Sequence, residues 1–301
     1  MNQTKTRKPN LLLIGAPRCA SSALAAAINH HPSIHVCDPK EPHFLAMDGS
    51  SQAVSGLGAE SFSKKNRMDR GQWSSLFCSK SERFLVDASV STISYPDTAI
   101  TNIRKYCDPD VKIIAILRNP VERAFSSYMY CVSRGWDAGT FEQSLEQESE
   151  RIDNNWQHLW FFRYLSEYEN RLKPFYAAFP DTNIHLMITE EFSTEPGKVL
   201  LDLFQFLDID EIDINAYERC NSGGAPKTRI VRELSTLVNQ RPVLRNRLKR
   251  LTSQHFRDSI RFRYFAKTDM ALETRADLKD SLCGASDWVQ NQLGRELRGW
   301  S

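Results

Sequence analysis

Short uninterrupted runs of apolar residues recur along this chain, and such runs are typical of strands buried on both faces of a parallel sheet. They occupy residues 11–14, 34–36, 84–86, 111–117 and 184–188, and the run VKIIAIL at 111–117 gives the strongest signal. Between these runs, the apolar residues recur at helical spacing. This pattern predicts a helix from Ser21 to Pro32, and further helices over 96–106, from Pro120 onward and over 196–207.

The order of these elements predicts the fold class. Strands that alternate with helices indicate an α/β protein whose central parallel sheet is flanked by helices. An aromatic-rich helical region is predicted at 141–179, and the chain beyond residue 207 is predicted as helices separated by a polar loop at 221–226. Because there is no internal repeat and no low-complexity linker, we expect residues 1–301 to form a single domain, with residues 1–8 flexible.

Composition and charge exclude several classes of protein. Of the 301 residues, 41% are hydrophobic and 25% are charged, as in a globular protein and unlike a disordered or disulfide-rich chain. The net charge of +2 gives no reason to expect a nucleic-acid partner. Seven cysteines without CxxC spacing indicate reduced thiols. No apolar stretch reaches the roughly 18 residues of a membrane span, so we expect a cytoplasmic protein.

The loop after the first predicted strand has the features of an anion site. This first loop, residues 15–22, reads GAPRCASS and leads into a helix. Backbone N–H groups and the positive helix end meet in such a loop, where Arg18 adds a charge and Ser21 and Ser22 add hydroxyls. A plain strand–helix turn with a capping serine is the alternative. The motif GxxxxGK[ST] fits only in part, because Ala20 replaces its second glycine and Ser21 its lysine, which disfavours a Mg²⁺-dependent NTPase.

A second anion site is predicted where the 111–117 strand ends. Arg118 follows that strand directly, and Ser126 lies eight residues later in the next helix. Ligands of doubly wound sheets bind at the carboxyl ends of the strands, where Arg118 would bind a phosphate bidentately and Ser126 would donate a hydrogen bond. A surface arginine beside an ordinary helical serine is the alternative. Two such sites indicate a ligand with two separate anionic groups.

Both loops resemble those of the sulfotransferases that use 3′-phosphoadenosine 5′-phosphosulfate (PAPS). Residues 15–24 fit the frame GxxKxGTTxL of that family's 5′-phosphosulfate loop without a gap, and residues 118–128 match its 3′-phosphate element, RxPxxRxxSxY. The resemblance implies a P-loop-like core with helical insertions and C-terminal helices, PAPS as co-substrate and no metal. It also implies that the nucleotide is bound by Arg18, Cys19, Ala20, Ser21, Ser22, Ala23, Arg118 and Ser126, with Lys227 and Arg229 as further candidates.

The chain departs from the family's pattern at several positions. Arg18 replaces the usual lysine, and because the charge is kept we expect it to retain the lysine's role. Ala20 replaces a glycine, and alanine resists a positive φ. Asp87 stands near the position at which some carbohydrate sulfotransferases have a lysine that assists the reaction, so that role is unassigned here. Lys227 and Arg229, in a loop that resembles the family's late loop, are equally compatible with ordinary surface charge.

Sulfuryl transfer needs a base that removes the proton of the acceptor. Residues 39–44, PKEPHF, follow the second predicted strand and resemble the KEPHF segment of heparan-type sulfotransferases, whose glutamate is the general base. The resemblance implies that Glu41 is the base, that His43 orients the acceptor or shares the proton, and that Arg18 grips the transferred group. A charged loop held by two prolines is the alternative.

Other residue types that often carry chemistry have weaker patterns. The spacing of His30, His31, His35 and Cys37 fits no zinc site, so we expect no metal there. Cys19 lies near a helix start, where a thiol can be activated, although a variable loop position is the commoner case. The tryptophans are candidates either for an acceptor pocket or, more commonly, for the core: Trp73, Trp136, Trp156 and Trp160.

The predicted function is transfer of a sulfuryl group from PAPS to a hydroxyl or amine of a carbohydrate or other small-molecule acceptor. Two alternatives stay open. One is a relative without catalytic activity that only binds the nucleotide, which the altered first loop makes conceivable. The other is a small-molecule kinase on a P-loop core, which Mg²⁺-dependent ATP turnover would support.

Overall fold

Five parallel strands form a central sheet within the residues that the computed structural model describes, which are 7–48, 54–59, 68–134, 136, 139–212 and 270–300. The strands are β1 (Leu11–Gly15), β2 (Ile34–Val36), β3 (Phe84–Asp87), β4 (Lys112–Leu117) and β5 (Ile184–Ile188). Their order in the sheet is β2-β3-β1-β4-β5, and every neighbouring pair is parallel. The predicted α/β fold with a central parallel sheet is confirmed.

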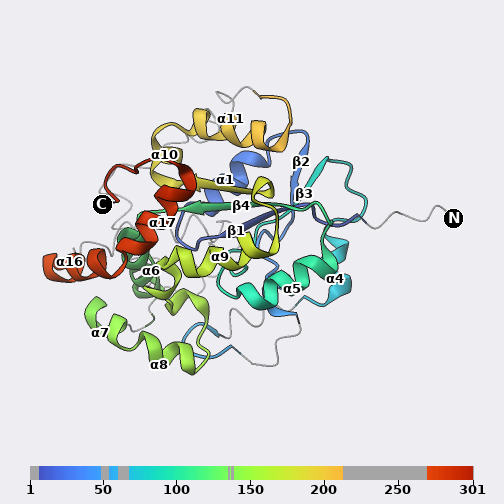
Figure 1. Ribbon diagram of the computed structural model, residues 1–301. Coiled ribbons are helices and arrows are strands. Elements are labelled where there is room, and N and C mark those ends of the chain that lie inside the picture. The colour runs from blue at the N-terminus through green and yellow to red at the C-terminus, as the bar shows by residue number, and fades with distance from the viewer. Residues whose placement is uncertain are drawn as a thin grey trace, which may run out of the picture.

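Helices cover both faces of this sheet (Figure 1). The helix α1 (Ser21–Ile28) lies with α10 and α11 on one side of the sheet, and α5 and α9 lie on the other side. The remaining bounds are α2 (Phe44–Met47), α4 (Arg70–Ser75), α5 (Pro96–Tyr106), α6 (Pro120–Ser133), α7 (Phe141–Glu146), α8 (Glu148–Asp153), α9 (Tyr168–Ala178), α10 (Thr189–Thr194), α11 (Pro196–Leu207), α16 (Leu272–Ser281) and α17 (Cys283–Leu293).

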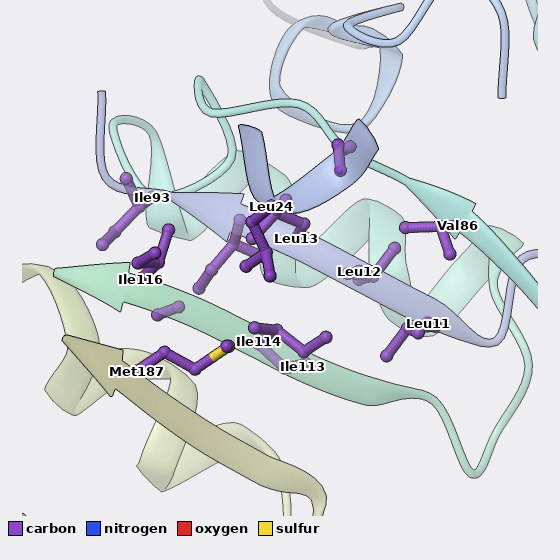
Figure 2. Close-up of a cluster of buried hydrophobic side chains, with 14 of the residues drawn as sticks. Leu11, Leu12, Leu13, Leu24, Val86, Ile93, Ile113, Ile114, Ile116 and Met187 are labelled. Carbon is purple, nitrogen blue, oxygen red and sulfur yellow. The ribbon is translucent and has the colours of Figure 1, made fainter. Parts of the chain in front are cut away.

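The strands are continuous apolar runs because both of their faces are covered. All five residues of β1 are buried, and so are the last five of β4, the neighbouring strand. Figure 2 shows how Leu13 of β1 packs near Leu24 of α1, with Ile114 of β4 in the same cluster. Each fully buried aliphatic side chain contributes about 1.5–3 kcal/mol of hydrophobic stabilisation, so this cluster stabilises the packing of β1, β4 and α1.

Two sequence predictions need correction. The helical region predicted at 141–179 is not continuous: α7, α8 and α9 are separated by turns and by short 3₁₀ segments at His158–Trp160 and Tyr164–Ser166. The first helix ends at Ile28, before the predicted Pro32, because the backbone N–H groups of His30 and His31 bond to carbonyl oxygens three residues back instead of four. The predictions for the first six residues and for the polar loop at 221–226 lie outside the described residues. Within the described ranges, no helix is long and apolar enough to cross a membrane.

The strand order decides which loops meet. In a parallel sheet all carboxyl ends lie at one edge, and ligands bind there. Because β1 lies between β3 and β4, the first loop has the segment after Asp87 on one side and the segment after Leu117 on the other. The end of β2, which leads to the 39–44 segment, lies one strand further along. The sequence segments singled out above therefore lie at a single edge of the sheet.

Candidate active site

The first loop, residues 15–22, has an unusual backbone. Gly15 has a φ of 149°, and a Cβ on this residue would lie 2.5 Å from Cγ2 of Ile93, so the position needs glycine. Arg18 and Ala20 have φ values of 70° and 61°, in the left-handed region. Ala20 is the N-cap of α1 and has no side-chain acceptor for the N–H groups of the first turn. Those N–H groups can therefore serve an anion.

Alanine at position 20 adopts the positive φ for which the family's pattern has glycine. The related frame has glycine at this position, and the left-handed φ of 61° explains why. Alanine adopts the conformation all the same, at a cost of about 1–2 kcal/mol for an L-residue in this region. The first loop thus keeps a left-handed residue at this position despite the substitution.

Arg18 and Arg118, which follow adjacent strands, repel each other electrostatically. The guanidinium of Arg18 lies over the ring of Tyr130, with its carbon 4.6 Å from the ring centroid. Burial lowers the pKa of Arg18, and the positive charge of Arg118 lowers it further, while Tyr130 acts in the opposite direction. Like charges held together in this way favour an anionic ligand, which relieves their repulsion.

A buried tyrosine ties the first loop to the second loop, residues 118–120. The hydroxyl of Tyr168, in α9, donates to the carbonyl oxygen of Arg118 at 2.6 Å and accepts from its N–H at 3.3 Å. The same hydroxyl lies 3.9 Å from Sγ of Cys19. Thr189 donates to the carbonyl oxygen of Cys19 at 3.0 Å. The two loops therefore share one rigid support.

The two arginines of the 118–128 motif differ in burial and in hydrogen bonding. Arg123 is fully buried, and its guanidinium donates to Oγ of Ser166 at 2.7 Å and to backbone carbonyl oxygens of residues 161 and 162. Arg118 is half-buried at the strand end, where Asn119 caps α6 by accepting from two backbone N–H groups. Ser126 lies on the same helix and is 7% exposed. Of the two arginines in the motif, Arg123 is thus tied up inside the fold, and Arg118 is the candidate for the site.

Glu41 lies beside the first loop, as a base for that loop's ligand must. Its Oε1 is 2.7 Å from Nζ of Lys40, and Lys40 in turn lies 3.5 Å from Oγ of Ser21. Its Oε2 is 3.4 Å from Nε2 of His43. Burial raises the pKa of Glu41, but other groups outweigh it, Lys40 most strongly, and hold the pKa below its usual value. Glu41 is therefore a carboxylate at neutral pH, and its side chain is 32% exposed to an incoming molecule.

His43 is held by a buried chain of hydrogen bonds. Its backbone N–H donates to Oγ of Ser89 at 3.0 Å, and its Nδ1 lies 2.6 Å from Oγ of Ser91. Ser89 donates to the carboxylate of Asp87 at 2.5 Å, which also accepts from Nε1 of Trp73 at 2.8 Å. Asp87, which the sequence left without a role, therefore supports the histidine. Burial lowers the pKa of His43 to about 4, so its ring is neutral at neutral pH.

One residue of this site escaped the sequence analysis. His158, the first residue of the 3₁₀ segment at His158–Trp160, lies next to His43 with ring centroids 6.1 Å apart. Burial lowers the pKa of His158 to about 3, and the neighbouring His43 acts in the same direction. Nothing in the local sequence distinguishes His158 from an ordinary core histidine, since the partner that defines its role lies far along the chain.

Several other sequence hypotheses are decided by burial. The side chain of Cys19 is fully buried, and burial raises the pKa of its thiol to about 11, so the idea of an activated thiol is wrong. Trp73 and Trp160 are core residues rather than pocket walls. Within the described residues, no three His, Cys, Asp or Glu side chains gather as metal ligands would. Lys227 and Arg229 lie outside the described residues.

Comparison with known proteins decides the family. Residues 8–222 match the family model for the sulfotransferase domain, and this match includes both loops and the 39–44 segment. The chain belongs to the sulfotransferase family. Its sequence is 23% identical over 175 residues to carbohydrate sulfotransferase 15 of Rattus norvegicus, covering 48% of this chain and 31% of that protein.

Two further comparisons agree with this family. The bifunctional heparan sulfate N-deacetylase/N-sulfotransferase 1 of Caenorhabditis elegans is 25% identical over 228 residues, covering 73% of this sulfotransferase and 24% of that protein. The chain thus spans about a third or less of the curated relatives that it matches. A solved sulfotransferase from Alicyclobacillus acidocaldarius superimposes with a TM-score of 0.73 at 24% identity, covering 97% of this chain and 98% of the other. That likeness confirms the fold.

Proposed function

We propose that this sulfotransferase moves the sulfuryl group of PAPS to a hydroxyl or amine of a carbohydrate or other small-molecule acceptor, with Glu41 as general base. The observation that carries the proposal is the meeting of three features at one sheet edge. The first and second loops each present an arginine and are joined by Tyr168, while Glu41 stands beside the first loop.

The donor's two anionic ends fit the two loops. We expect the 5′-phosphosulfate to bind Arg18 and the start of α1, where Ser21, Ser22 and Ala23 offer N–H groups and hydroxyls. We expect the 3′-phosphate to bind Arg118 and Ser126. Support for this donor comes from a mouse sulfotransferase solved in complex with PAP, which superimposes with a TM-score of 0.50 at 16% identity, covering 96% of this chain and 88% of the other.

The proposed reaction is an in-line displacement at sulfur. The acceptor oxygen or nitrogen forms a bond to sulfur as the bond between sulfur and the bridging oxygen breaks, and the electron pair stays with the departing 3′-phosphoadenosine 5′-phosphate (PAP). The acceptor's proton passes to the carboxylate of Glu41. Arg18 and the N–H groups of α1 stabilise the charge that develops on the donor. His43, neutral and fixed by Ser89 and Ser91, positions the acceptor or Glu41.

A carbohydrate is the acceptor that the relatives favour. The names of both curated relatives include a carbohydrate or heparan sulfate sulfotransferase, which supports a carbohydrate. The partly exposed Glu41 is compatible with an acceptor that arrives from solvent. Other small alcohols and amines have the same reacting group.

The test is transfer of radiolabelled sulfate. We expect the protein, incubated with [³⁵S]PAPS and extracts of small metabolites and glycans, to label an acceptor that mass spectrometry then identifies. The labelling should persist in excess chelator, because arginine and N–H groups supply the positive charge. PAP binding without any transfer would favour the relative that only binds the nucleotide. An absolute requirement for Mg²⁺ and ATP would favour the kinase.

A further inference from the structure

The ammonium group of Lys40 bridges the proposed base and the first loop. Its Nζ is 2.7 Å from Oε1 of Glu41 and 3.5 Å from Oγ of Ser21 in the first turn of α1. The side chains of Lys40 and Glu41 are 24% and 32% exposed, whereas Ser21 is buried. A lysine carries its charge on a flexible four-carbon stem, so Nζ can shift toward the loop without a change in the backbone.

This ion pair makes Glu41 a weaker base. The titratable groups that act on the carboxylate are Lys40, His43 and His158, and Asp87 is the other carboxylate coupled to it. Because His43 and His158 are neutral at neutral pH, Lys40 is the cation among these four groups. Burial alone would raise the pKa of Glu41, and Lys40 is the largest influence that lowers it. Withdrawal of Lys40 would therefore make Glu41 a stronger base.

A bound donor would compete with Glu41 for the ammonium group of Lys40. PAPS would bring an anionic sulfonate to the loop that contains Ser21, already within 3.5 Å of Lys40. Arg18, the cation within the loop itself, lies over the ring of Tyr130 and so offers its charge to the donor from a fixed place. Lys40 would thus be a mobile cation at the rim of the sulfonate's site. Before the donor binds, it is paired with Glu41.

We propose that Lys40 moves from Glu41 to the sulfonate when PAPS binds, so that the base is released only in the donor complex. The proposal rests on the proposed function, since it takes PAPS as the ligand of the first loop. Because only PAPS carries the sulfonate, this contact adds to the preference for PAPS over PAP, beside the contribution of Arg18. Once the sulfuryl group has left, Lys40 returns to Glu41.

The test compares dissociation constants for PAPS and PAP by calorimetry in four proteins: wild type, Glu41→Gln, Lys40→Met and the double variant. The decisive comparison is between Glu41→Gln and the double variant, because both lack the Glu41 carboxylate. Lys40→Met alone would leave that carboxylate unpaired beside the sulfonate and so add a repulsion. A lost charge-assisted contact predicts that the preference for PAPS over PAP falls about ten- to hundredfold from Glu41→Gln to the double variant. Glu41→Gln itself should prefer PAPS more strongly than wild type, since Glu41 no longer competes.

Controls separate this proposal from its alternatives. Lys173→Met removes a lysine–glutamate pair of the same kind, 2.5 Å long, on the exposed face of α9, and should change neither constant. Retained PAP binding shows that each variant is folded. If the double variant prefers PAPS as strongly as Glu41→Gln, Lys40 is only a partner of Glu41 and the proposal is overturned. If wild type binds neither nucleotide, the proposed function itself fails.

Discussion

Replacing Tyr168 by phenylalanine tests whether one buried hydroxyl holds the two loops together. The substitution removes two hydrogen bonds to the backbone of Arg118, at 2.6 and 3.3 Å, and keeps the ring that packs in the core. Each such bond contributes about 0.5–1.5 kcal/mol, so the free energy of unfolding should fall by about 1–3 kcal/mol. Urea unfolding measures this loss.

The same change should weaken binding chiefly at the second loop, because both lost hydrogen bonds are to Arg118, whereas Thr189 still holds Cys19 of the first loop. If nucleotide binding must restore the order that Tyr168 provided, PAP affinity falls by the same 1–3 kcal/mol, or about five- to hundredfold. Adenosine 5′-phosphate, which lacks the 3′-phosphate, should bind as it does to wild type. Tyr176→Phe removes a hydroxyl from the same helix at a half-buried position away from the loops, and serves as the control. A Tyr168→Phe protein that is destabilised but binds PAP normally would refute the reasoning.

Three other expectations follow from the site. Arg118→Ala should weaken PAP binding by roughly ten- to more than a hundredfold, without affecting adenosine 5′-phosphate; equal losses for both nucleotides would contradict the assignment. Ala20→Gly relieves a left-handed alanine and should raise the free energy of unfolding by about 0.5–1 kcal/mol, with PAP affinity within threefold; a loss of stability would show that the residue is unstrained. Burial lowers the pKa of His43 and His158 to about 4 and 3, below the unfolded value of about 6.5, so the unfolded chain gains protons first as the pH falls. Stability present above pH 6.5 should decline toward pH 4 by up to about 1.4 kcal/mol per pH unit for each histidine, and less steeply in His158→Gln; an unchanged slope would argue against a neutral buried pair.

Much of the fold could be predicted because its signals are local. The strand β5 and the helices α5 and α11 span the predicted residues, since a buried strand is a continuous apolar run and a proline marks each helix start. The break-up of the 141–179 region could not be predicted in this way. There, Glu148 is buried and accepts from the N–H groups of residues 163 and 164, at 3.0 Å each, so a distant turn is folded around one carboxylate.

In the candidate site, too, the residues with a local sequence signal could be predicted and those without one could not. Gly15, Arg18, Arg118 and Glu41 lie in segments that follow predicted strands, so the strand order brings these segments to one edge of the sheet. Groups that support them from elsewhere carry no local signal. The hydroxyl of Tyr168 reaches Arg118 across 50 positions of the chain, and the packing of the fold, not any motif, places it there.

The contacts of Lys40 with Glu41 and Ser21 could not be predicted from the PKEPHF segment alone. The segment PKEPHF places a lysine beside the proposed base in sequence, which is compatible with a solvated lysine or with one that tunes its neighbour. The structure distinguishes these cases, because Nζ of Lys40 contacts both Glu41 and Ser21. Ser21 lies 19 positions before Lys40 in the chain, so this contact follows from the tertiary structure.

The most direct test of the central claim is single-turnover transfer from [³⁵S]PAPS by wild type and by Glu41→Gln, with the acceptor that the labelling screen identifies. The substitution keeps the shape and the hydrogen-bonding capacity of the side chain but removes its ability to accept a proton. General-base catalysis contributes about 10²–10⁴-fold, so the transfer rate should fall by that factor while the dissociation constant for PAP stays within roughly threefold. Transfer by Glu41→Gln at the wild-type rate would contradict the account.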